Sequence, residues 1–204
     1  VPTAEVDRNF AYALNVNAHG TGLLMAGLIE TGLKPWICYV SSSHVYAPSP
    51  APLREDFPCT SSSGYGLTKY LGEMSVSALA DRFDATVAIA RIFSYYDELQ
   101  AGSFLYPAWV EKLKRWDGKS DIEVFGGKSV RDFSSANEVA ARLEKLMNCN
   151  FCGTVNVGSG RAQTVVDFLR DRFGDDYPWV PLGSADTIIP DLSKLNSILG
   201  GACD

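Results

Sequence analysis

The stretch Tyr65-Gly-Leu-Thr-Lys69 separates a phenol and an ammonium group by four positions. On a helix, positions i and i+4 lie on one face, so these side chains would be neighbours. A tyrosine with a pKa of about 10 is a poor base at neutral pH, whereas a nearby cation stabilises the phenolate and lowers that pKa. Such a pair can take a proton from a substrate hydroxyl while hydride leaves the same carbon. From this motif alone, a buried tyrosine with an exposed lysine is the commoner interpretation, because this spacing occurs by chance in many helices.

Two groups of polar and aromatic residues follow short apolar runs. The run Trp36–Val40 is followed by Ser41-Ser42-Ser43-His44, and the run Ala85–Ile92 is followed by Phe93-Ser94-Tyr-Tyr96. Continuous apolar runs of this length are typical of buried parallel strands. In open parallel sheets, ligands bind beyond the carboxyl ends of the strands. We therefore expect both groups at one edge of a sheet, where a serine hydroxyl could hold a reacting oxygen beside Tyr65.

Apolar spacing predicts helices that alternate with these strands. The expected helices cover residues 15–32, 64–83, 104–116, 137–147 and 165–173, and a further strand covers 154–159. Such alternation favours an α/β fold in which helices lie on the faces of a parallel sheet. We expect strands 36–41 and 85–92 to be adjacent, parallel and buried.

Composition limits the class of protein. The 204 residues are 46% hydrophobic, enough for one sizeable core, and carry a net charge of −6, which argues against a nucleic-acid partner. No apolar stretch is long enough to span a bilayer, and no secretory signal is visible at the start, so we expect no membrane partner. Five scattered cysteines form no dense framework, which favours reduced thiols and a cytoplasmic location. We expect no metal site.

Seven motifs, in order, resemble the extended short-chain dehydrogenase/reductases, in particular the NAD-dependent epimerase/dehydratase group. Four lie in the first half of the chain: Asn17-Ala-His-Gly-Thr21, Ser41-Ser-Ser-His-Val-Tyr46, Tyr65 to Lys69 with Glu73, and Arg91-Ile-Phe-Ser-Tyr-Tyr96. Three lie in the second half: Arg131-Asp-Phe133 with Glu138-Val-Ala140, Asn156-Val-Gly-Ser-Gly160, and Asp191-Leu-Ser-Lys194 with Leu199-Gly200. Each motif is weak alone, whereas seven in order are specific.

The resemblance implies a role for each matching residue. Tyr65 is the implied acid/base, Lys69 lowers its pKa and binds the nicotinamide ribose, and Ser42 is the catalytic hydroxyl. The implied cofactor-binding residues are Asn17, Ser41, Tyr65, Lys69 and Phe93. The implied substrate-binding residues are Ser43, His44, Ser94 and Arg131, and the guanidinium of Arg131 would suit a diphosphate because its fork matches two phosphate oxygens.

The resemblance also implies an activity and its partners. It suggests hydride transfer at a sugar carbon by an epimerase or a 4-keto reductase, with NAD or NADP as cofactor and a nucleotide-diphosphate sugar as substrate. Ser43 and His44 stand where 4,6-dehydratases carry Asp-Glu, which disfavours dehydration. Relatives often dimerise through two helices, here near 15–30 and 64–82. A non-catalytic relative that acts as a binding or scaffold protein is the alternative.

The same resemblance suggests a division into two parts. Residues 1–93, continued in parts of 120–160, would form the Rossmann-like core, and residues 94–119 and 161–204 would form mainly a small substrate-binding lobe. The family begins with Gly-x-x-Gly-x-x-Gly, which these 204 residues lack. We therefore expect a fragment, a chain without its N-terminal part, or a degenerate member of the family.

Overall fold

The structure is a computed structural model that describes residues 3–61 and 63–201. Its centre is a parallel sheet of three strands, β1 (Ile37–Ser42), β2 (Val87–Ile92) and β6 (Gly153–Val157), in the order β1-β2-β6. The register between β1 and β2 runs from Ile37 opposite Val87 to Ser42 opposite Ile92. Every residue of β2 is buried. The prediction that these two strands are adjacent, parallel and buried is confirmed for the pairing and for β2, while β1 is the partly exposed edge strand.

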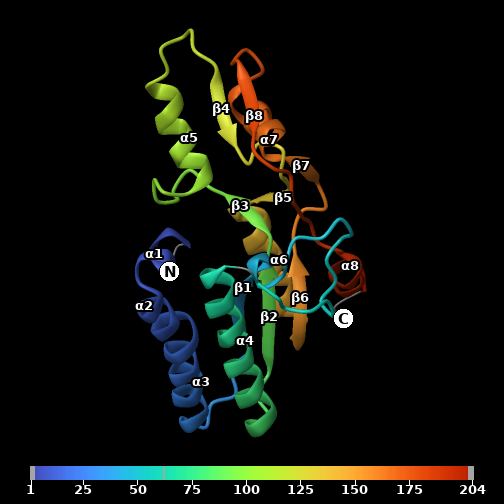
Figure 1. The fold of residues 1–204 in the computed structure, drawn as a ribbon. Helices are drawn as coiled ribbons and strands as arrows, with labels where there is room; N and C mark the ends of the chain where they lie inside the picture. The colour runs from blue at the N-terminus through green and yellow to red at the C-terminus, as the bar shows by residue number, and fades with distance from the viewer. Residues whose placement is uncertain (1–2, 62, 202–204) are drawn as a thin grey trace.

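Helices cover both faces of this sheet, as predicted (Figure 1). Helices α3 (Thr21–Glu30) and α4 (Gly64–Phe83) pack on one face, where they form a cluster with β1 and β2. Helices α6 (Ala136–Asn148) and α8 (Ser193–Gly200) pack on the other face. The protein therefore has an α/β, Rossmann-like core.

Helix α4 has the predicted bounds because its ends carry strong signals. The Ser63 hydroxyl accepts the N–H of Gly66 at 3.0 Å, and Asp84 ends the helix in the left-handed region with a φ of 54°. Gly66 and Gly72 allow the helix to approach β1 closely. A Cβ at Gly66 would lie 1.9 Å from the His44 carbonyl oxygen, and one at Gly72 would lie 2.1 Å from the hydroxyl oxygen of Tyr39. This approach brings the first turns of α4 to the carboxyl end of β1.

The region expected as one helix at 15–32 is divided in the structure. A π-helix, η1 (Asn15–Gly20), precedes α3, and two short helices, α1 (Thr3–Arg8) and α2 (Phe10–Leu14), come before it. The Asn17 carbonyl accepts hydrogen bonds from the hydroxyls of Tyr39 and Thr21, at 3.1 and 3.0 Å. These bonds give this carbonyl partners outside the regular helical ladder, which explains why the expected helix is interrupted here.

The remaining strands form two further sheets in the upper part of Figure 1. Strands β3 (Ser94–Tyr96), β5 (Val130–Ser135) and β7 (Ala162–Thr164) pair in that order, and β9 (Thr187–Ile188) also pairs with β5. Strands β4 (Ile122–Phe125) and β8 (Trp179–Leu182) form a parallel pair. Helices α5 (Leu105–Lys114) and α7 (Val165–Phe173) complete this part.

An aromatic core holds these upper elements together. Phe133 of β5 stacks on Phe168 of α7 with ring centroids 4.0 Å apart, and Trp109 of α5 meets Trp179 of β8 edge to face at 5.5 Å. Helix α8 lies outside this cluster because Leu195 packs with β6 and α6. The range 161–204, expected mainly in the lobe, therefore divides between α7, β7, β8 and β9 in the upper part and α8 on the central sheet.

Two further expectations concern the cysteines and the membrane. Cys38, Cys59 and Cys152 are free thiols. Cys149 is disulfide-bonded, so the expectation that all cysteines are reduced is wrong at this position. Within the described residues, no helix is long and apolar enough to cross a membrane.

Candidate active site

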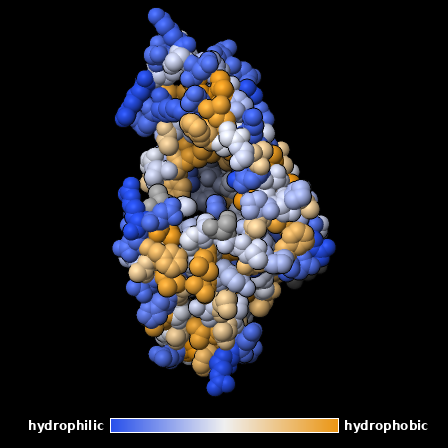
Figure 2. Space-filling view, in the orientation of Figure 1, coloured by the Kyte–Doolittle hydropathy of each residue, from blue (hydrophilic) through white to orange (hydrophobic). Residues whose placement is uncertain are grey.

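A cleft of about 760 Å³ lies between the carboxyl end of the central sheet and the upper part of the molecule. Figure 2 shows the surface hollowed near the middle of this face. The sheet and α4 contribute hydroxyls and a cation, and the upper part contributes mainly aromatic and apolar side chains. The central lining residues are Ser42, His44, Tyr65, Lys69, Phe93 and Phe104.

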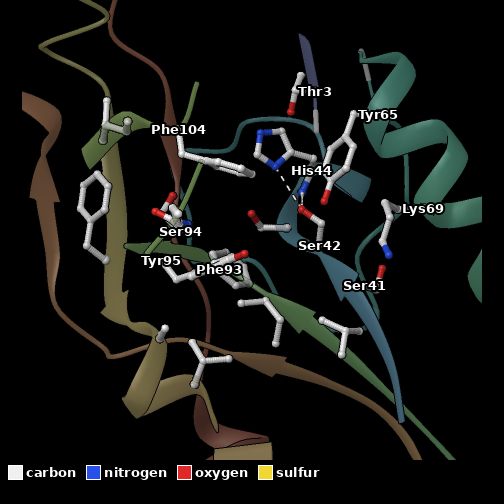
Figure 3. A pocket seen from close by; sticks show the side chains of 18 of the residues that line it. Thr3, Ser41, Ser42, His44, Tyr65, Lys69, Phe93, Ser94, Tyr95 and Phe104 are labelled. Carbon is white, nitrogen blue, oxygen red and sulfur yellow. Dashed lines mark hydrogen bonds between the residues drawn. The ribbon is translucent and has the colours of Figure 1, made fainter. Parts of the chain in front are cut away.

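Ser42 and Tyr65 face one another across this cleft (Figure 3). Ser42 is the last residue of β1, and Tyr65 lies in the first turn of α4. The Ser42 hydroxyl is close enough to the phenol to lower the pKa of Tyr65. His44, in the short 3₁₀ helix η2 (Ser43–Val45), donates its backbone N–H to the Ser42 hydroxyl oxygen at 3.2 Å. The expectation that the two hydroxyls share a cleft is confirmed.

The electrostatics differ from the expectation at Tyr65. Burial raises the pKa of Tyr65 and outweighs the hydrogen bond with Ser42, which lowers it. The prediction that the pKa of Tyr65 is depressed is therefore wrong, because protein atoms exclude water from the phenol.

Lys69 is a half-buried cation that lies one turn along α4 from Tyr65. Burial lowers the pKa of Lys69 to about 8, and the charge of Glu73 opposes this change. The Lys69 ammonium nitrogen lies 4.4 Å from the centre of the Tyr39 ring. Within the described part of the chain, Lys69 forms no salt bridge with a carboxylate.

The three remaining expected cofactor-binding residues lie in different places. Ser41 and Phe93 line the cleft, but both are largely buried, and the Ser41 hydroxyl donates to the Glu73 carboxylate. Asn17 lies behind α4 and outside the lining, and its side-chain amide donates to the Thr68 hydroxyl at 3.0 Å. Because this amide is buried and already paired, Asn17 supports the position of α4.

Of the expected substrate-binding residues, three line the cleft and one lies outside it. Ser43, His44 and Ser94 line the cleft. Arg131 lies outside the lining and donates two hydrogen bonds, both of 3.0 Å, to the Asp186 carboxylate. This is the bidentate geometry that a guanidinium also uses with phosphate. A diphosphate would have to compete with Asp186 for the same two donors.

Sequence reasoning missed several lining residues. Thr3, Tyr95, Gln100, Phe104 and Leu105 all line the cleft. Tyr95 lies within a stretch that we expected to follow a strand end, so its place at the rim was foreseeable. The others belong to irregular segments or to short helices, whose position depends on packing between parts that are distant in the sequence.

A buried polar network supports the floor of the site. Arg91 of β2 pairs with Glu73 of α4 at 2.7 Å, and the side chains are only 7% and 4% exposed. Arg91 also donates to the Tyr46 hydroxyl at 2.7 Å, and Tyr46 donates to the Asn156 side chain at 2.9 Å. This network joins α4, β2 and β6, so it helps to fix the helix that carries both Tyr65 and Lys69.

Comparison with known proteins identifies the family. The family model described as the NAD dependent epimerase/dehydratase family matches residues 3–158. The chain belongs to this family. The matched range contains every residue of the Ser42, Tyr65 and Lys69 cluster, as well as His44 and Arg131.

Curated relatives extend the comparison to named enzymes. The chain is 26% identical to the UDP-glucose 4-epimerase of Bacillus subtilis (strain 168), over 90% of this chain and 62% of that protein. It is also 26% identical to a putative UDP-glucose 4-epimerase of Methanocaldococcus jannaschii, over 81% of this chain and 56% of that protein. The chain thus spans about three-fifths of the length of these relatives.

Solved structures share the fold of this family member. MoeE5 in complex with UDP-glucose and NAD is 25% identical, with a TM-score of 0.80 over 96% of this chain and 68% of that chain. RMD from Pseudomonas aeruginosa, complexed with NADPH, is 21% identical, with a TM-score of 0.86 over 98% of this chain and 71% of that chain. At 21% identity, the likeness to RMD concerns the fold alone.

Proposed function

We propose that this family member catalyses hydride transfer at a sugar carbon of a nucleotide-diphosphate sugar, as an epimerase or a 4-keto reductase. The observation that carries the proposal is the convergence of Ser42, Tyr65 and Lys69 in one cleft, at the carboxyl end of a parallel sheet. In open α/β sheets this is the edge where ligands bind.

In this proposal the chain's own residues handle the proton. Tyr65 accepts the proton of the sugar hydroxyl as the carbon is oxidised, and returns it when the carbon is reduced. Ser42 faces Tyr65 in the cleft and holds the reacting oxygen beside the phenol. Lys69 stabilises the phenolate once a ligand closes the cleft, because excluded water strengthens the attraction between opposite charges.

The state of Lys69 favours an enzyme over a scaffold protein. A buried ammonium group without a carboxylate partner costs stability. A scaffold would gain nothing from it, whereas catalysis needs a positive charge beside a developing phenolate. The lowered pKa of Lys69, about 8, therefore supports a catalytic role.

The residues present fit the nicotinamide end of the proposed cofactor, NAD or NADP. The Lys69 ammonium donates no hydrogen bond to any residue that the structure describes, so it can donate to ribose hydroxyls, and the buried Phe93 ring offers an apolar wall at the end of β2. When bound, the cofactor would accept or supply the hydride. MoeE5 was solved with NAD and RMD with NADPH, so both forms remain within the proposal.

The proposed substrate is a nucleotide-diphosphate sugar, with the sugar between Tyr65 and the aromatic side chains, such as Phe104, that the upper part of the molecule contributes to the cleft. Ser43, His44 and Ser94 lie where they can contact it. Arg131 would bind the diphosphate after exchanging Asp186 for phosphate oxygens. The printed names of the relatives make UDP-glucose the first candidate.

We further propose a cytoplasmic homodimer that joins through α3 and α4. Several large apolar side chains on these helices are exposed, namely Leu23, Leu24, Leu67 and Met74. Figure 2 shows apolar surface over the lower half of the molecule, where these helices lie. Sedimentation of the native protein, compared with a Leu24→Glu variant, tests this association.

Oxidation of bound UDP-glucose tests the proposed activity. The native protein is mixed with NAD and UDP-glucose, and reduced cofactor is followed by its fluorescence. Formation of reduced cofactor in the wild type and its loss in Tyr65→Phe is the expected result. Equal rates in the two proteins would contradict the proposal.

A further inference from the structure

We propose that Ser42 and His44 form a proton relay that connects the Tyr65 phenol to the solvent in the cleft. The inference rests on the proposed function of Tyr65 and adds a route by which that residue exchanges its proton. The Ser42 hydroxyl oxygen lies 3.1 Å from Nδ1 of His44, and Ser42 faces the Tyr65 phenol closely enough to lower its pKa (Figure 3). The His44 and Tyr65 rings meet edge to face with centroids 5.5 Å apart. Phenol, hydroxyl and imidazole are therefore neighbours, in an order that allows a proton to pass from one to the next.

The chain can carry a proton in either direction without moving a heavy atom. If Nδ1 of His44 is unprotonated, the Ser42 hydroxyl donates to it and accepts from the Tyr65 hydroxyl. If Nδ1 carries a proton, it donates to Ser42, and the Ser42 hydroxyl donates towards the Tyr65 oxygen. The backbone N–H of His44 holds the Ser42 oxygen in both states.

The proton balance is explicit. After Tyr65 has given its proton to the product alkoxide, the phenolate takes the hydroxyl proton of Ser42. Ser42 takes the Nδ1 proton of His44 as its own O–H bond breaks, and Nε2 of His44 takes a proton from water. One proton thus moves from solvent to Tyr65, and a flip of the His44 ring then restores the starting tautomer with a proton on Nδ1; the reverse sequence releases one proton during oxidation of an alcohol.

The surroundings suit His44 for this task. Its side chain is exposed within the cleft, so water can reach the ring. The groups that act on it come from three elements: Tyr65 of α4, Arg131 of β5, and Asp186 just before β9. Although one side of the ring reaches the cleft, the protein atoms around its other side desolvate it, and this desolvation and the charge of Arg131 lower the pKa of His44, while Asp186 opposes them. The ring is therefore neutral at pH 7, with one nitrogen able to accept a proton and the other able to donate one.

The relay distinguishes the two proposed reactions. In an epimerase, Tyr65 takes a proton and returns it to the same oxygen, so no exchange with solvent is needed. In a reductase, each turnover consumes the Tyr65 proton, which must be replaced. A built path to solvent therefore favours net oxidation or reduction as the reaction of this site.

Nuclear magnetic resonance of the two histidines tests the relay without a substrate. The chain contains only His19 and His44, and His19 is exposed on η1, outside the cleft. Long-range ¹H–¹⁵N spectra report which ring nitrogen carries the proton. Ser42→Ala and Tyr65→Phe should each move the Nδ1 signal and the titration midpoint of His44, and they should leave the ring ¹⁵N signals of His19 unchanged at constant pH. Unchanged His44 signals in both variants would overturn the proposal.

A kinetic test of the native protein separates relay from positioning. His44→Ala should lower turnover with NAD and UDP-glucose by about 10–100-fold, less than the ~10²–10⁴-fold typical of a direct acid or base. Added imidazole at constant pH should restore much of the rate, because it can supply the missing proton carrier. His44→Asn keeps a hydrogen-bonding group near Nδ1 but cannot titrate, so it should remain slow. His19→Gln is the matched control.

The outcomes separate this inference from the proposed function. If Tyr65→Phe stops turnover while His44→Ala keeps the wild-type rate at every imidazole concentration, the relay is wrong and the function stands. Full activity in His44→Asn would show that His44 only positions Ser42, which also contradicts the relay. Full turnover in Tyr65→Phe would instead refute the proposed function.

Discussion

Replacing Lys69 by methionine should stabilise the protein at neutral pH although it removes a residue of the proposed site. The pKa of Lys69 falls from an ordinary 10.5 to about 8, mainly because the ammonium group is buried. Each pKa unit corresponds to about 1.4 kcal/mol, so the folded state loses about 3 kcal/mol by keeping this charge. The cation–π contact between the Lys69 ammonium and the Tyr39 ring stabilises the folded state by about 1 kcal/mol. Lys69→Met should therefore gain about 2 kcal/mol at pH 7.

The pH dependence gives this prediction a definite sign. Between pH 8 and 10.5 the unfolded chain binds more protons at this position than the folded one, so the stability of the wild type rises with pH in that window. The excess in the free energy of unfolding of Lys69→Met over the wild type should be largest below pH 8 and should disappear near pH 10.5. Urea unfolding at a series of pH values measures the free energy of unfolding of both proteins.

An exposed lysine provides the control for this experiment. Lys119 lies on the surface, and Lys119→Met should change the free energy of unfolding by less than about 0.5 kcal/mol at any pH. If Lys69→Met destabilises the protein at pH 7, or if its effect is the same at pH 7 and pH 10, the ammonium group is not desolvated in the way described. The argument that a costly buried cation indicates catalysis would then fail.

Two further predictions concern the network below the site and the diphosphate. Glu73→Gln leaves the Arg91 charge buried and unpaired, so it should cost about 3–5 kcal/mol in urea unfolding, whereas the exposed Glu111→Gln should cost less than about 1 kcal/mol. A smaller loss at Glu73 than at Glu111 would contradict the network. Arg131→Ala should raise KM for UDP-glucose more than it lowers kcat, because a diphosphate contact persists from ground state to transition state. Asp186→Asn should tighten UDP binding in calorimetry, since it removes the competing carboxylate; weaker binding would show that the pair is structural.

Local signals in the sequence predicted the parts of the fold that depend on local physics. Helix α4 matches its expected bounds because a serine cap and a left-handed residue mark its ends. The parallel pairing of β1 and β2 followed from two apolar runs separated by a helix. Ser42 and Tyr65 meet because both lie where a strand or helix end reaches the same edge of the sheet. Patterns of this kind carry short-range information that a single sequence contains.

Features that depend on distant partners were not predictable. Arg131 pairs with Asp186, which lies 55 residues away, and nothing in the local pattern links the two. The pKa of Tyr65 depends on how completely the cleft excludes water, which spacing along a helix does not report. The π-helix at 15–20 reflects a hydroxyl from Tyr39 on a neighbouring strand. Each of these errors arises where tertiary contacts override a correct local rule.

The central claim is that Tyr65 carries the proton in a hydride transfer. Single-turnover oxidation of UDP-glucose with NAD, measured in the native protein and in Tyr65→Phe, tests it most directly, because the variant keeps the ring and removes only the hydroxyl. The rate should fall by about 10²–10⁴-fold, with the Kd for UDP-glucose nearly unchanged. A Tyr65→Phe protein that transfers hydride at the wild-type rate would contradict the account.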